Sequence, residues 1–208
     1  MEDIVIIGSG GHGREVAFLI ERINKVDCKW NLLGYISLND IGETKYGYNV
    51  LGDHSWFLKN STVKNCIIAI GYPEVRLKVY NELSKYNLNF PNIIDPQAMV
   101  AEDVKMGCGN VIQGPGRLQV GVEVGSFCLL NGVCSIGHDA KIGSFVSMMP
   151  FTAISGNVEI GNNVLFGIGA KVIEKVKIGS NVTVGACSLV LDDIKDNTRV
   201  LGIPAKIK

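Results

Sequence analysis

The apolar positions follow two different rhythms along the chain. Before residue 92, the short runs "DIVIIG", "LLGYIS" and "CIIAIG" have the length and β-branched character of buried strands. Between them lie segments with helical spacing. One helix is predicted over residues 14–24, with Val16, Leu19, Ile20 and Ile23 on one face. A second is predicted to open at Pro73-Glu74 and to carry Val75, Val79 and Leu83. Strands that alternate with helices indicate a small α/β unit around a parallel sheet.

From Ile94 onward the period becomes six. Every sixth residue from Ile94 to Val190 is apolar, seventeen in a row, and a second column four residues later holds only small or β-branched residues and Asn110. No helix has a strict period of six, whereas a triangular coil of three hexapeptides does. We therefore predict five to six stacked coils, about 25 Å tall. The first column is expected to fill the interior and the small column to fit the turns. The predicted domains are residues 1–92 and 93–208.

Composition points to small-molecule partners. The chain of 208 residues carries 20 acidic and 20 basic side chains, so it has no net field to attract nucleic acid or an anionic membrane. It has no apolar stretch long enough to span a bilayer and no secretion signal at its start, and we expect a cytoplasmic protein. The six cysteines lack paired metal-ligand spacing, which favours buried reduced thiols.

The segment Gly8-Ser9-Gly10-Gly11-His12-Gly13 fits G-x-G-x-x-G between a predicted strand and a helix. Such glycines let the backbone approach phosphate oxygens, and the helix N-terminus supplies amide donors. A site for NAD also needs an acid at the end of the second strand. That strand ends "GYISLND", with Ser37 where the acid would stand and Asp40 three residues later. These residues favour a nucleotide diphosphate-sugar over a nicotinamide cofactor; a purely structural turn is the third interpretation.

The six-residue period resembles that of the hexapeptide-repeat acyltransferases. Four further stretches, "VIIGSGGHGREV", "AIGYPEVR", "SGNVEIG" and "VLGIPAKIK", are similar to the sialic-acid and nucleotide-aminosugar acetyltransferases of the NeuD and PglD types. This resemblance covers nearly the whole chain. It implies a small Rossmann-like domain that binds a nucleotide-sugar, followed by a left-handed parallel β-helix that binds acetyl-CoA. It also implies a homotrimer with active sites at the subunit interfaces.

His138 is the candidate general base. It stands two residues after the interior residue Ile136, which puts it at an outward corner, where its neighbours one coil away are Val120 and Gly156. A structural core histidine would occupy the interior column, so the competing interpretation is an idle exposed histidine. Acetyl transfer requires a group that takes a proton near neutral pH, and histidine does so. Asp139 could hold the ring tautomer; its alternative is a solvated turn residue.

The resemblance also assigns the remaining site residues. Those implied for the nucleotide-sugar are Gly10, Gly11, His12, Gly13, Ser37, Asp40 and Gly71. Those implied for acetyl-CoA are Ser147, Gly156, Gly167, Ile168, Gly185, Ala186 and Lys206. Glycines in tight turns and a basic C-terminus have ordinary structural explanations as well.

The sequence thus predicts an acetyl-CoA-dependent N-acetyltransferase acting on the amino group of a nucleotide-activated sugar, with no metal. A rival in the same fold is an O-acetyltransferase of a sialic acid or related sugar. Two alternatives belong to other functional classes: a non-catalytic trimeric scaffold and a dinucleotide oxidoreductase.

Overall fold

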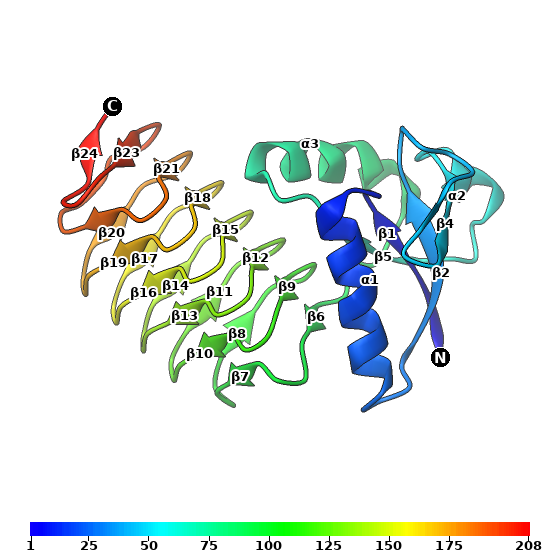
Figure 1. The fold of residues 1–208 in the computed structure, drawn as a ribbon, viewed down its shortest axis with the longest axis horizontal. Coiled ribbons are helices and arrows are strands. Elements are labelled where there is room, and N and C mark those ends of the chain that lie inside the picture. Colours follow the sequence, from blue (N-terminus) through cyan, green and yellow to red (C-terminus); the bar gives the residue numbers. More distant parts are fainter.

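The first part of the chain forms a five-stranded sheet with helices packed against it (Figure 1). The structure, a computed structural model, describes residues 1–208. The strands are β1 (Glu2–Ile7), β2 (Trp30–Ile36), β3 (Thr44–Lys45), β4 (Tyr48–Gly52) and β5 (Asn65–Ile68), in the order β3-β4-β2-β1-β5. The helices are α1 (Gly11–Asn24), α2 (Trp56–Lys59) and α3 (Pro73–Leu83), followed by the 3-10 turn η1 (Ser84–Tyr86). All strand pairs are parallel except β3 with β4, as the alternation of strands and helices predicts.

Two details differ from the sequence-based predictions. Helix α1 begins at Gly11, three residues early, because the end of the glycine loop already has helical conformation. On α3, Val75 is 41% exposed, so its prediction as a buried residue is wrong. The buried face of α3 carries Pro73, Arg76 and Leu83 instead, because α3 packs against the rest of the chain on the side where Arg76 lies.

The remainder of the chain is a stack of triangular coils whose sides are short strands, a parallel β-helix. The first face consists of β7 (Met99–Val100), β10 (Arg117–Leu118), β13 (Ser135–Ile136), β16 (Ala153–Ile154), β19 (Lys171–Val172) and β22 (Leu189–Val190). The second face consists of β8 (Lys105–Met106), β11 (Glu123–Val124), β14 (Lys141–Ile142), β17 (Glu159–Ile160) and β20 (Lys177–Ile178). The docked face consists of β6 (Ile93–Ile94), β9 (Val111–Ile112), β12 (Leu129–Leu130), β15 (Ser147–Met148), β18 (Leu165–Phe166), β21 (Thr183–Val184) and β23 (Arg199–Leu201), and β24 (Lys206–Ile207) pairs antiparallel with β23.

Both repeating columns point into the coils. First-column residues such as Ile136 and Phe166 are fully buried, as predicted. The small column lies in the same interior cluster, and Val122, Cys134 and Ala140 are no more than 1% exposed. The expectation that this column only fits the turns is therefore incomplete. Side chains two residues apart on an extended segment point to the same side, and small ones fit where the coil bends.

The last coil is shorter than the others. Ile178 pairs with Ile194 and Thr183 with Arg199, a separation of 16 residues where the earlier coils have 18. Ile194 therefore occupies a first-column place, whereas the strict count puts it in the small column. The strand pairing continues past the shortened turn, and β23 and β24 end the stack.

The two parts of the chain share an apolar interface. Ile93, Val111 and Leu129 point outward from the docked face and are buried in the core cluster of the N-terminal domain. Beside α3, the rings of Phe127 and Phe145 stack with centroids 5.0 Å apart. The predicted boundary after residue 92 falls directly before β6, yet the cores on its two sides are in contact.

The turns between the faces form three corners, each named here by one residue. The His138 corner joins the first and second faces (residues 119–122, 137–140, 155–158 and 173–176). The Met149 corner joins the docked and first faces (residues 113–116, 131–134, 149–152, 167–170 and 185–188). The Phe145 corner joins the second and docked faces (residues 125–128, 143–146, 161–164 and 179–182).

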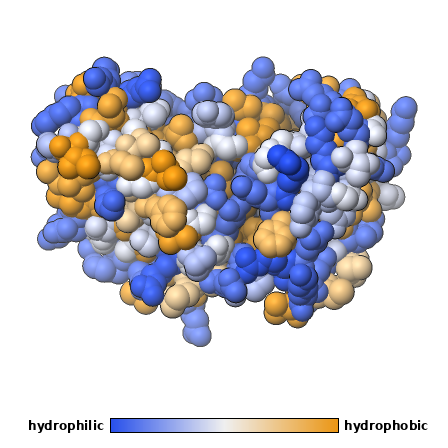
Figure 2. All heavy atoms as spheres, viewed as in Figure 1, coloured by the Kyte–Doolittle hydropathy of each residue, from blue (hydrophilic) through white to orange (hydrophobic).

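Apolar side chains are unevenly spread over the surface. Figure 2 shows patches of them over the β-helix on the face in view. Val133, Phe151 and Ile168 are 46–58% exposed, and all three belong to the Met149 corner. None of the helices has the length and apolar character needed to cross a membrane.

Candidate functional site

The imidazole of His138 lies on the surface with one ring nitrogen paired and the other free of protein partners. The main chain is fixed from both sides: Asp139 N donates to Val120 O at 3.0 Å, and Asn157 N donates to His138 O at 2.9 Å. Nδ1 lies 2.9 Å from Asp139 Oδ2, and the histidine side chain is 59% exposed. A carboxylate at Nδ1 favours the tautomer with its hydrogen on Nδ1. Nε2 then presents a lone pair to solvent, as a base requires.

Gly156 gives the histidine ring its place. A Cβ at position 156 would lie 2.5 Å from Nε2 of His138 and 2.7 Å from Cε1. The main chain at Gly156 is not in the left-handed region, so its conformation does not demand glycine. The absence of a side chain therefore serves the ring above it, and a structural turn requirement does not account for this glycine.

Asp139 occupies a turn position with a left-handed backbone. Its φ is +58°, and Asn157 and Lys175 have the same conformation at the equivalent places in the next two coils. Aspartate and asparagine tolerate this region better than most residues. The carboxylate lies over Gly121, where a Cβ would collide with Oδ1. The His–Asp pair thus rests between two glycines, Gly121 and Gly156.

The glycine loop shapes an open anion site. A Cβ at Gly13 would collide with Gly8 O, so this glycine permits the close approach of loop and helix. At Gly10 no atom lies within 4 Å of the Cβ position, and the first turn of α1 has no acidic residue and no side-chain cap. The amides at the start of α1 and its positive dipole end are therefore available to phosphate.

The end of β2 lies beside this loop, as predicted. Ser9 Oγ donates to Asp40 Oδ2 at 3.4 Å, and Lys45 Nζ lies 2.6 Å from the same oxygen. The hydrogen bond from Lys45 lowers the pKa of Asp40. Ser37 Oγ accepts from Asn39 N at 3.3 Å. Asp40 thus contacts the loop, Ser37 is bonded within its own turn, and Lys45, which the motif does not contain, pairs with Asp40.

The glycine loop faces the Met149 corner. His12 Nδ1 lies 3.2 Å from Glu15 Oε2, and Gln113 of that corner donates to the same oxygen at 3.4 Å. The hydrogen bond with His12 lowers the pKa of Glu15. Gly71 also lies at this corner, since Met149 Cε would be 3.8 Å from a Cβ there. The predicted sugar-binding residues therefore gather at one corner and His138 projects from another.

Two family models match parts of the chain. Residues 3–83 match the PglD N-terminal domain, and residues 157–192 match the bacterial transferase hexapeptide model of six repeats. Each of the two domains thus contains a region that is similar to one of these families. The predicted family is confirmed, and so is the fold class, a small Rossmann-like domain followed by a left-handed parallel β-helix.

Solved structures resemble this chain over its whole length. One is a mutant, with asparagine in place of a histidine, of perosamine N-acetyltransferase from Caulobacter crescentus in complex with CoA and GDP-perosamine. It has a TM-score of 0.92 and 26% identity, with 100% of this chain and 97% of that chain covered. Another is the acetyltransferase domain of PglB from Neisseria gonorrhoeae FA1090, with a TM-score of 0.90, 27% identity and full coverage of both chains. No curated protein sequence matches the chain significantly.

The residues predicted for acetyl-CoA divide between two corners of the β-helix. Gly156 lies at the His138 corner. Gly167, Ile168, Gly185 and Ala186 lie at the Met149 corner, across the first face. Lys206 is exposed on β24 at the far end of the stack. A single chain does not bring these groups together.

Ser147 departs from its prediction as a coenzyme residue. Its side chain is fully buried, donates to Gly71 O at 2.7 Å and accepts from Arg76 Nη2 at 2.8 Å. With its hydroxyl occupied inside the domain interface, it cannot contact a coenzyme at the surface. Arg76, which the motif "AIGYPEVR" contains but the sequence reasoning passes over, is buried beside it.

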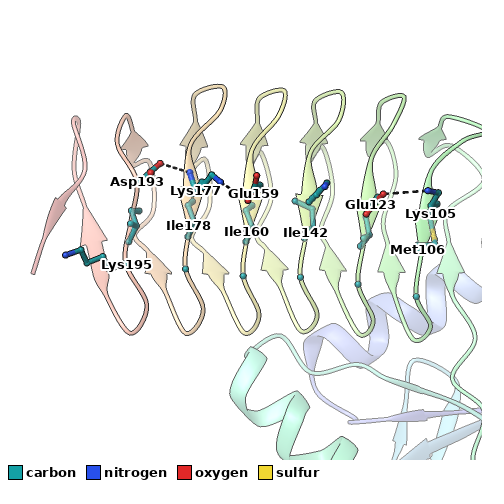
Figure 3. Close-up of a pocket in the computed structure, with 18 residues that line it drawn as sticks. Lys105, Met106, Glu123, Ile142, Glu159, Ile160, Lys177, Ile178, Asp193 and Lys195 are labelled. Carbon is teal, nitrogen blue, oxygen red and sulfur yellow. Dashed lines mark hydrogen bonds and ion pairs between the residues drawn. The ribbon is translucent and has the colours of Figure 1, made fainter.

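A surface hollow of about 930 Å³ runs along the second face and contains neither His138 nor the glycine loop. Its side chains alternate in charge from strand to strand (Figure 3), with Lys105 3.7 Å from Glu123 and Lys177 3.3 Å from Glu159. Opposite charges on neighbouring strands stabilise a sheet modestly. We therefore read this hollow as a solvated structural face. No group of three or more His, Cys, Asp or Glu side chains is placed to hold a metal ion.

Proposed function

We propose that the protein transfers the acetyl group of acetyl-CoA to the amino group of a nucleotide-linked sugar. The observation that carries this proposal is the full-length similarity to perosamine N-acetyltransferase, whose structure contains CoA and GDP-perosamine. The open anion site at α1 and the free Nε2 of His138 support it. A cytoplasmic location belongs to the proposal, since all six cysteines are free thiols, the state that reducing compartments maintain.

In the proposed mechanism, His138 is the general base. Its Nε2 accepts the proton of the sugar amine as the amine nitrogen attacks the thioester carbonyl carbon. Asp139 holds Nδ1 and stabilises the charged imidazolium that results. The carbon–nitrogen bond forms, the carbon–sulfur bond breaks, and the proton held on Nε2 passes to the departing thiolate. No acyl group is attached to the protein at any stage.

The complete site is proposed to lie between two chains of a homotrimer. Around a threefold axis, the His138 corner of one chain would approach the Met149 corner and glycine loop of the next. Exposed Val133, Phe151 and Ile168 at the Met149 corner support this, because closed oligomers bury such surface. The division of the predicted coenzyme residues between two corners has the same explanation.

The test is CoA release in the presence of GDP-, UDP- and dTDP-linked 4-amino sugars and free sialic acid, with His138→Ala and Asp139→Asn. Loss of a positioned base should lower kcat by about 10²–10⁴-fold. Asp139→Asn should have a smaller effect, since asparagine keeps the left-handed turn but cannot stabilise the imidazolium. His54→Ala is the matched control: Nδ1 of His54 lies 3.3 Å from Glu82 in a comparable pair outside the β-helix.

The outcomes separate the candidate functions. A folded His138→Ala protein with near wild-type turnover would remove His138 from the mechanism. Acetylation of sialic acid alone would replace the amine acceptor with a hydroxyl. With an amine acceptor, raising the pH should partly restore the alanine variant, because a neutral amine is already a fair nucleophile. If no acceptor leads to release of CoA, the non-catalytic trimeric scaffold becomes the favoured function.

A further inference from the structure

Arg76 is a buried cation with no acidic partner. Its side chain is 2% exposed, and Arg76 is the largest of the fully buried residues. No carboxylate lies within ion-pair distance of it. Burial lowers its pKa to about 10, so the guanidinium remains charged near neutral pH. Burying a charge without a counter-ion is costly, and an apolar side chain would fill the same space more cheaply.

On one side the guanidinium binds the β-helix at the Phe145 corner and the start of β15. Nε donates to Phe127 O at 2.8 Å, and Nη2 donates to Val146 O at 3.3 Å and to Ser147 Oγ at 2.8 Å. These groups belong to two successive coils. They fix Arg76 to the β-helix through three separate hydrogen bonds.

On the other side Arg76 holds the loop that follows β5. Nη1 donates to Ile70 O at 2.5 Å and lies 3.3 Å from Gly71 O. Gly71 O also accepts from Ser147 Oγ at 2.7 Å, so arginine and serine together secure one peptide. Just before it, Ala69 O would lie 3.1 Å from a Cβ at Gly8. The loop over residues 69–71 is therefore a wall of the glycine-loop site.

We infer that Arg76, with Ser147, is a positioning residue that sets the nucleotide-sugar loop in register with the β-helix. The guanidinium joins five acceptors across the domain interface, and two of them are in that loop. A shift of the loop would move a wall of the nucleotide-sugar site, so the sugar would bind less tightly and its KM would rise. This role extends the proposed function and rests on it for its kinetic consequences.

The experiment compares Ser147→Ala and Arg76→Lys with Arg22→Ala. Arg22 also joins the domains, through an ion pair of 3.0 Å with Asp95, but it has no contact with the loop over residues 69–71. The acceptor is the amino sugar that the wild type acetylates. Ser147→Ala should raise its KM about 10-fold, the worth of one or two lost hydrogen bonds, and change the KM for acetyl-CoA less than about 2-fold. Arg22→Ala should lower Tm and leave both KM values unchanged.

A second readout does not depend on activity. Hydrogen exchange of the amides of residues 8–13 and 69–72 should quicken in Ser147→Ala and Arg76→Lys and stay unchanged in Arg22→Ala. Lower Tm with unchanged KM values and unchanged local exchange would overturn the inference and leave Arg76 a structural residue. If the wild type acetylates no amino sugar, the proposed function fails, and local exchange alone decides whether Arg76 and Ser147 fix the loop. Should Arg76→Lys not fold, Ser147→Ala decides the question, because it removes only a hydroxyl.

Discussion

His138 and Gly156 face each other across one step of the coil stack. The period of six places the histidine at a corner, and the residue one coil later leaves it room to lie flat against the main chain. Asp139 completes the unit from a left-handed turn position that aspartate tolerates. At the scale of single residues, the candidate base therefore needs a residue without a side chain at position 156 as well as its own imidazole.

Gly156→Ala should displace the ring of His138 while the fold persists, because the backbone at 156 suits any residue. We expect kcat to fall by about 10–100-fold, since an offset of about 1 Å in a reacting group has an effect of that order. Gly132→Ala is the matched control: it stands at the same turn position, and the nearest atom to its Cβ would be 3.8 Å away. Equal kcat in the two variants, with both folded by circular dichroism, would show that the ring does not need this space.

Buried thiols predict how stability changes in alkali. Three of the six cysteines are buried, and three are exposed, contrary to the expectation for all six. Burial raises the pKa of Cys66, and raises that of Cys128 and Cys134 to about 11. Unfolded thiols ionise near pH 8.5, so above that pH the unfolded chain binds fewer protons than the folded chain.

The free energy of unfolding should therefore fall between pH 8.5 and pH 10, by up to ~1.4 kcal/mol per pH unit for each buried thiol. Urea unfolding at several pH values measures this. Cys134→Ala should reduce the slope, and alanine already occupies equivalent column places such as Ala140 and Ala170. Cys28→Ser, at an exposed site, should not change it. If the free energy of unfolding had the same pH dependence in both variants, the buried Cys134 thiol would not be a source of it.

At the scale of elements, each strand of the β-helix is too short to be stable alone, and the coil is stabilised by its neighbours above and below. Strands of two residues pair in register over a long stack, and the interior is filled by the two apolar columns. Phe166 is the largest residue of the first column and is fully buried. Its ring belongs to a single cluster that runs through the coils.

Phe166→Ala should lower the free energy of unfolding by about 3–5 kcal/mol, because the coil cannot close over the cavity that remains. Leu191→Ala, at a residue 40% exposed on the same β-helix, should cost less than ~1 kcal/mol. Urea denaturation monitored by circular dichroism compares the two. Similar losses would mean that the interior is not packed as tightly as its burial indicates.

At the scale of the whole molecule, the two domains are joined through buried apolar side chains and through Arg76. Ile93, Val111 and Leu129 belong to the N-terminal core, so a β-helix cut away near residue 93 would expose an apolar face. The N-terminal domain is thus fixed to the docked face with its glycine loop beside the Met149 corner, and His138 stands at the other edge of the first face. This placement is the reason for locating the site between chains.

Mixed trimers test that placement. Gly10→Asp would set a carboxylate in the anion site without steric conflict, since nothing lies within 4 Å of its Cβ position. Gly10→Asp and His138→Ala chains should each be nearly inactive alone. Coexpressed in equal amounts, they should regain about a quarter of wild-type activity, because one site in four then combines an intact loop with an intact base from a neighbour. No recovery in isolated mixed trimers would place loop and base in one chain, and a monomer by sedimentation would remove the trimer.

The sequence by itself determined the features that repeat or follow one another closely along the chain. Interior columns, strand spacing, the glycine loop and the outward place of His138 all follow from period and local motif, because neighbouring residues impose them. The shortened last coil lies beyond Val190, the last residue counted in the first column, and its sign in the sequence is the polar Asp196 at the next six-residue place.

Only the tertiary structure decided how the distant parts meet. Where α3 packs against the β-helix, Val75 is exposed and Arg76 is buried. The same contact buries Ser147 in the domain interface, so it does not lie in the predicted coenzyme site. These outcomes depend on the fit of surfaces from segments some 70 residues apart. The free energy of that contact cannot be derived from the local pattern of hydrophobic and polar positions.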